Sequence, residues 1–145
     1  MSGGGLFDSL DYSFTPGHED GTDIAPNGPG GGSPALRRGL RILSEFLRGL
    51  PLESLSVDTV TVAHASGVSA RVLSSAKTGV YAMYLDGAGP ASLMLQLSKG
   101  TYGVQWIDPL TGKALREEEL PSRPRFTIDS PPFEKGIAVK ISRKP

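Results

Sequence analysis

The chain has 145 residues, no cysteine, and 15 basic residues balanced by 15 acidic ones. The balanced charge gives no electrostatic reason to expect a nucleic acid or an anionic membrane as a partner. The lack of cysteine excludes disulfides, thiolate catalysis and cysteine-ligated zinc. No apolar run approaches the roughly 20 residues of a membrane-spanning helix, and no signal peptide is visible, so the sequence predicts no membrane segment and leaves the compartment open.

The 19 glycines and 12 prolines of the chain are concentrated before residue 35. Segment 26–34 is close to low complexity, which favours a loop or linker. The densest group of titratable residues, His18, Glu19 and Asp20, lies before it. A glycosidase holds two carboxyl groups at a set separation on a rigid scaffold, and adjacent residues in a glycine-rich loop do not supply that arrangement. We therefore interpret this group as a polar turn and assign no catalytic residue.

A helix is predicted over residues 34–49. Ser33 can cap it, Pro34 suits its first position, and Gly49 is suited to end it. A wide apolar stripe should run along one side, and basic residues should form a solvated face. Such a stripe needs a large partner surface, so we expect either docking on the rest of the chain or self-association, with self-association favoured. The stripe comprises Leu36, Leu40, Ile42, Leu43, Phe46, Leu47 and Leu50, and the basic face Arg37, Arg38 and Arg41.

From Leu55 onward apolar residues alternate with polar or small ones, which is typical of strands with one buried face. Residues 54–145 are therefore predicted to form an antiparallel β-sandwich of about seven strands. One α-helix and an irregular Gly/Pro-rich arm, within residues 1–53, precede it, so the fold class is mainly β. Prolines should confine neighbouring strands to sheet edges. The predicted strands are 57–63, 71–75, 80–85, 92–97, 102–107, 125–128 and 137–141, and the prolines are Pro121, Pro124, Pro131 and Pro132.

Several side chains of the predicted strands allow two interpretations. Trp106 and Tyr102, with Tyr81 and Tyr84, could stack against sugar rings, but the alternation places Trp106 and Tyr102 on the face of a core residue. We favour the core for both. The charge run 116–119 is interpreted as a solvated edge strand or loop. The core should contain Leu93, Leu95, Leu97, Tyr102, Val104, Trp106, Ile137, Val139 and Ile141.

No cofactor or metal site is predicted. The two histidines, His18 and His64, lie in different segments, so a shared metal site or a nucleophile–base pair would need a coincidence of folding.

The strand-like runs also carry a family resemblance. Segment 100–112, Gly-Thr-Tyr-Gly-Val-Gln-Trp-Ile-Asp-Pro-Leu-Thr-Gly, follows Tyr-Ala-Met-Tyr-Leu at 81–85 and Leu-Met-Leu at 93–95. Together these runs resemble the C-terminal β-sandwich of bacterial glycoside-hydrolase-like barrel proteins, a domain family named for collagen binding. Segments 6–14, 18–21 and 29–37 resemble the last strand, loop and helix of the preceding barrel. A complete barrel needs about 250 residues, so the resemblance implies the tail of a larger protein.

The resemblance implies a non-catalytic C-terminal accessory module that stabilises a barrel by covering an apolar face and binds polysaccharide weakly. The expected partners are the catalytic barrel of the parent protein, a polysaccharide, and a second copy of the chain through the helix. The alternative is a piece of a glycoside hydrolase, in which residues 1–32 contribute to an active site completed by sequence absent from this chain. Fold analogy does not decide between them.

Overall fold

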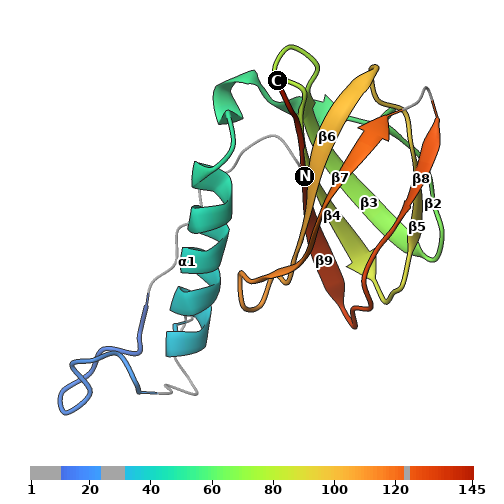
Figure 1. Ribbon diagram of the computed structural model, residues 1–145. Helices are drawn as coiled ribbons and strands as arrows, with labels where there is room; N and C mark the ends of the chain where they lie inside the picture. The colour runs from blue at the N-terminus through green and yellow to red at the C-terminus, as the bar shows by residue number, and fades with distance from the viewer. Residues whose placement is uncertain (1–10, 24–31, 123–124) are drawn as a thin grey trace.

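The computed structural model describes residues 11–23, 32–122 and 125–145. Within them, nine strands form two antiparallel sheets that face each other, and one α-helix lies outside the sandwich (Figure 1). The expected fold class, mainly β with a sandwich and one preceding helix, is confirmed. Residues 1–10 and 24–31, on which part of the barrel resemblance depends, lie outside the described residues, as does Pro124.

The two sheets differ in size. The larger has six strands in the order β1-β3-β4-β9-β6-β7, and the smaller has three in the order β2-β5-β8. The strands of the larger sheet are β1 (Ser56–Asp58), β3 (Val68–Ser75), β4 (Val80–Gly87), β9 (Gly136–Arg143), β6 (Gly100–Ile107) and β7 (Ala114–Ser122). Those of the smaller sheet are β2 (Val62–Ala65), β5 (Ser92–Leu95) and β8 (Phe126–Asp129).

The predicted strand 57–63 is instead two strands in different sheets, β1 and β2. The carboxylate of Asp58 fixes the corner between them, since it accepts hydrogen bonds from the backbone N–H groups of Val60 and Thr61 and from the hydroxyls of Thr61 and Ser74. Partial burial would raise the pKa of Asp58, but these hydrogen bonds outweigh it and lower the pKa to about 2. An Asx turn of this kind was not anticipated from the alternation alone.

The core between the sheets contains every residue that the alternation assigned to it. Trp106 is 0% exposed, and Tyr102 is also fully buried, where its ring meets that of Tyr81 edge to face with centroids 6.2 Å apart. The interpretation of Trp106 and Tyr102 as core residues is therefore confirmed, and neither ring is accessible to a sugar. Tyr84, on the outer face of β4, remains exposed.

The charge run 116–119 lies in β7, the edge strand that the list of seven omitted. Glu117 and Glu119 point to solvent as expected, but Arg116 and Glu118 are half-buried on the inner face. The indole N–H of Trp106 donates to Glu118 Oε1 over 2.9 Å, and the Arg116 guanidinium lies 5.5 Å from the centroid of the Trp106 ring. The prediction of a solvated run was wrong for these two residues, because a buried indole N–H needs an acceptor.

Helix α1 (Pro34–Arg48) begins and ends close to the predicted positions. The hydroxyl of Ser33 accepts a hydrogen bond from the Leu36 N–H over 3.0 Å, as the capping prediction requires. A one-turn 3₁₀ helix (Leu52–Ser54) then leads into β1.

The helix lies along the outer face of the six-stranded sheet (Figure 1). Lys140 Nζ on β9 donates to the carbonyl of Gly49 over 2.6 Å, and Ile42 lies over Gly112 in the turn between β6 and β7. Docking on the sandwich was one of the two expected outcomes. Self-association stays a prediction.

Replacing Trp106 with alanine is expected to lower the free energy of unfolding by about 3–5 kcal/mol. The substitution opens a cavity in the core and removes the hydrogen bond from the indole N–H to Glu118. Urea unfolding would measure the loss. The matched control is Met94→Ala on the outer face of β5, where a change of about 0.5 kcal/mol is expected. Equal stabilities for the two variants would contradict the core role of Trp106.

Candidate functional site

The group His18, Glu19 and Asp20 forms an exposed turn in the arm. The backbone N–H of Gly17 donates to Glu19 over 2.9 Å, and the Thr22 hydroxyl donates to Asp20 over 2.6 Å. The first hydrogen bond lowers the pKa of Glu19, and the second lowers that of Asp20. A carboxyl group that acts as a general acid near neutral pH needs a raised pKa instead. The geometry is that of a polar turn.

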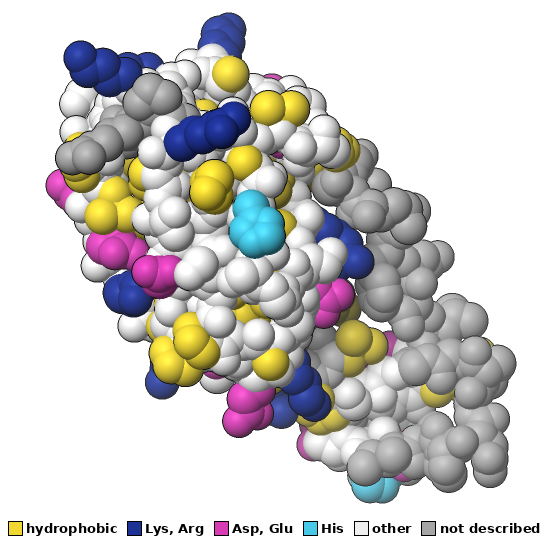
Figure 2. All heavy atoms as spheres, turned by 90° about the vertical axis from the view of Figure 1, so that its right-hand side faces the viewer, with side chains coloured by type: hydrophobic (Ala, Val, Ile, Leu, Met, Phe, Trp, Pro, Cys, Tyr) yellow, Lys and Arg dark blue, Asp and Glu magenta, His cyan; other side chains and the backbone are white. Residues whose placement is uncertain are grey.

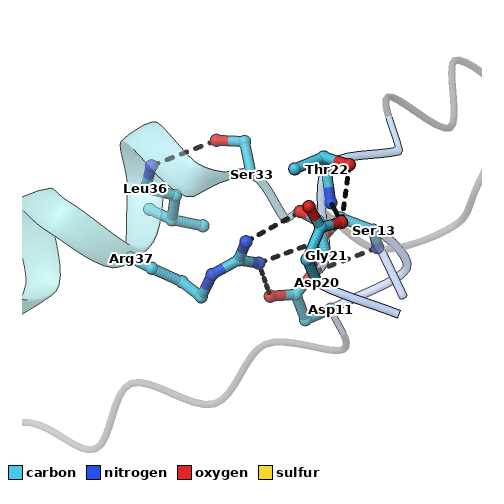
Figure 3. Close-up of polar contacts among 8 residues, drawn as sticks. All are labelled: Asp11, Ser13, Asp20, Gly21, Thr22, Ser33, Leu36 and Arg37. Atoms are coloured by element: carbon cyan, nitrogen blue, oxygen red, sulfur yellow. Dashed lines mark hydrogen bonds and ion pairs between the residues drawn. The ribbon is translucent and has the colours of Figure 1, made fainter. Parts of the chain in front are cut away.

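Arg37 fixes this arm to the helix (Figure 3). Its Nη1 donates to Asp11 Oδ2 and to Ser13 Oγ, both over 2.8 Å, and its Nη2 donates to the carbonyl of Gly21 over 2.7 Å. The guanidinium also lies 4.9 Å from the centroid of the Phe14 ring. The planar guanidinium has five N–H donors, so it can bond to several acceptors of the arm at once.

Sequence reasoning placed Arg37 on a solvated face with Arg38 and Arg41, and for Arg37 this was wrong. Arg38 is exposed and Arg41 forms an ordinary pair with Glu45 within the helix, with 2.9 Å between Nε and Oε1. The signal that could have identified Arg37 is its position in the first helical turn, next to an arm that contains Asp11. Gly21 must be glycine here, since it has a φ of +73° and a Cβ would lie 2.7 Å from the Arg37 guanidinium.

A groove of about 450 Å³ runs between α1 and the outer face of the six-stranded sheet. Apolar side chains line both walls, and Arg71 is the one charged side chain among the lining residues. From the helix come Ile42, Leu43, Phe46, Leu47 and Leu50, and from the sheet Leu73, Ala82, Tyr84, Ile107 and Ala138.

The leucine stripe of α1 is covered unevenly. Leu50, just beyond the helix, is only 8% exposed, whereas Leu36 and Leu43 are 36% and 52% exposed. Beyond the groove, Tyr84 and Pro109 also line a second hollow of about 410 Å³ that includes Leu110, which is 79% exposed. The groove and this hollow therefore adjoin at Tyr84 and Pro109, although the hollow also carries the charged residues Asp108, Glu134 and Lys135.

A polar hollow lies beside the helix over Gly103, on β6, β7 and β9. Glu119 pairs with Lys144 over 2.8 Å, and Gln105 Nε2 donates to Glu117 over 2.7 Å. Its lining contains three glutamates and two lysines, so it presents hydrogen-bonding groups without a strong field of either sign.

The outer face of the three-stranded sheet offers no dense cluster of one side-chain type (Figure 2). His64 lies exposed on β2, and Figure 2 shows the two histidine side chains well apart. Among the residues that the structure describes, no group of three or more His, Asp or Glu side chains is placed to hold a metal ion. No helix in the described part of the chain has the length and hydrophobicity needed to cross a membrane.

Neither a protein-family model nor a curated protein sequence matches the chain. The resemblance to the sandwich of glycoside-hydrolase-like proteins therefore stays a prediction.

The Arg37 cluster predicts how the arm is held. Arg37→Met keeps the apolar stem but removes the donors, so amide exchange at Asp23, whose N–H donates to the Ser13 carbonyl, should accelerate by at least about tenfold. The melting temperature of the sandwich should not change, because the cluster does not touch it. Hydrogen exchange followed by NMR would measure the first and a thermal melt the second, with Arg38→Met as the control. Equal exchange in the two variants would show that Arg37 does not hold the arm.

Proposed function

We propose that the chain is a non-catalytic accessory module of a glycoside-hydrolase-like protein, and that the exposed edge of α1 docks against the catalytic barrel of that protein. The observation that carries the proposal is the uneven cover of the leucine stripe, which leaves Leu36 and Leu43 partly exposed, with Leu43 on the wall of the apolar groove. Surfaces of this kind usually mark an interaction site. Covering the stripe with a barrel would stabilise both parts.

The arm supports a non-catalytic role. The carboxylates of Asp11, Glu19 and Asp20 accept hydrogen bonds from neighbouring groups of the arm, and each pKa is lowered by them. Two carboxyl groups with opposite pKa shifts on rigid elements would instead favour a hydrolase.

Weak polysaccharide binding, the second part of the proposed role, would depend on hydrogen bonds rather than on stacking against Trp106 or Tyr102. Trp106 and Tyr102 are in the core, so neither can form a stacking platform. The polar hollow over Gly103 presents an amide, carboxylates and ammonium groups that could bond to sugar hydroxyls.

The second candidate is a piece of a hydrolase. One observation favours it: Arg37 holds the arm in a defined position, so the turn at His18 to Asp20 could face an active site supplied by other sequence.

Docking predicts that Leu36→Gln and Leu43→Gln lower the melting temperature of a longer protein in which the proposed barrel is joined to this chain. In the 145-residue chain alone both changes should lower the melting temperature less than in the longer protein, because the two side chains are 36% and 52% exposed. Differential scanning calorimetry of both lengths would measure this, with Val60→Gln as the control, because Val60 is 70% exposed and lies outside the helix. The absence of an upstream coding frame, or equal shifts for Leu43→Gln and Val60→Gln in the longer protein, would contradict docking.

The non-catalytic role predicts that the purified chain releases no product from a panel of aryl glycosides. Glu19→Gln is the diagnostic variant, and circular dichroism would check its fold. Turnover by the chain that Glu19→Gln abolishes, with the fold unchanged, would favour the hydrolase.

A further inference from the structure

The groove between α1 and the six-stranded sheet has the size and lining of a small-molecule site. Its volume of about 450 Å³ lies within the range of ligand pockets, which is about 300–1,000 Å³. Phe46 and Leu47 on one wall, and Leu73 and Ala82 on the other, offer water few hydrogen bonds. An apolar body is therefore the occupant that the walls favour.

Arg71 supplies the one charged side chain in the groove lining. It lies on β3 directly opposite Tyr84 of β4, so both side chains are on the outer face that α1 covers. Its ion pair with Asp86 is long, at 3.4 Å between Nη1 and Oδ2, and both side chains are about half exposed. Such a pair contributes little, and a guanidinium has five N–H donors. Arg71 can therefore bind a second carboxylate through a bidentate contact.

We propose that this groove binds a small amphiphile with an apolar body and a carboxylate head, of the kind a medium-chain fatty acid represents. The body lies between α1 and the sheet, and the head lies at Arg71. The inference goes beyond the proposed function, because it requires no partner domain. A second copy of the chain and the barrel are the competing occupants of the same surface.

The head group can be tested by comparing ligands that share one tail. Decanoate, decanol and decylammonium, each below its micelle-forming concentration, are titrated into the 145-residue chain by calorimetry. Decanoate should bind about tenfold more tightly than decanol, because its carboxylate gains a charge-assisted contact with Arg71. Decylammonium should bind most weakly, because the guanidinium of Arg71 repels its ammonium group. In Arg71→Gln the affinity for decanoate should fall to that for decanol.

The groove can be tested by filling it. Gly39 of α1 lines the groove, and a Cβ built there meets no atom within 4 Å, so Gly39→Leu should occupy the space without a clash. This substitution also removes a glycine from a helix interior, so the variant should remain folded, as its melting curve would check. It should abolish decanoate binding. Arg48→Gln, in the last turn of α1 and outside the groove lining, is the control that should bind as the unaltered chain does.

Three outcomes would overturn the inference: equal or absent binding of the three ligands, unchanged decanoate binding by folded Gly39→Leu, or a loss in Arg48→Gln as large as that in Arg71→Gln. Sedimentation completes the test. A dimer that decanoate does not dissociate, and that Gly39→Leu disrupts, would assign the groove to a second copy instead.

Discussion

The packing of Trp106 between the two sheets is the interaction on which the rest of the sandwich depends. Its ring is fully buried, and a buried indole N–H without an acceptor would destabilise the fold by roughly 1–3 kcal/mol. Glu118 on the neighbouring edge strand supplies the acceptor, and Arg116 neutralises that carboxylate over 3.1 Å. Arg116 also donates to the carbonyl of Asp129 on β8 and so joins the edge of the larger sheet to the smaller sheet. On the inner face of β7, Arg116 and Glu118 thus contact Trp106 of the core. On its outer face, Glu117 and Glu119 are exposed to water, as is common for an edge strand.

The same sheet shapes the surface that the functional proposals concern. Its inner face carries the large core side chains, whereas the outer face opposite α1 has the small Ala82 and Ala138 on the central strands β4 and β9, beside larger side chains such as Leu73. The helix and the residue after it meet the sandwich at Ile42, which lies over Gly112, and at the backbone carbonyl of Gly49, which accepts from Lys140. A groove remains between them because small side chains on the sheet do not fill the space that the helix spans. The docking and ligand proposals both depend on this incomplete packing of α1 against the sheet. In the first the barrel covers the exposed edge of the helix, and in the second a ligand fills the groove.

The arm and the helix are joined by polar contacts rather than by a core. Arg37 converges on Asp11, Ser13 and Gly21, and the turn that follows Thr15 satisfies its own carboxylates. Interactions of this exposed kind define a position without contributing much stability. The arm is therefore held beside α1, and each hydrogen bond that Arg37 donates ends within the arm.

The sequence by itself determined the features that depend on near neighbours. The period of two assigned the inner faces of β5, β6 and β9 correctly, and Ser33, Pro34 and Gly49 marked the ends of the helix. Tertiary structure decided the features that depend on residues distant in the chain. Asp11 and Arg37 are 26 positions apart, and Gly49 and Lys140 are 91 apart. The half-buried position of Arg116 and Glu118 in β7 also depends on tertiary structure. The sequence alone predicts a solvated charge run, because it does not show that Trp106 lies beside these residues. The groove between α1 and the sheet could not be predicted from the local sequence pattern either. An amphipathic stripe predicts that a helix face is buried, but not how closely the opposing surface packs against it.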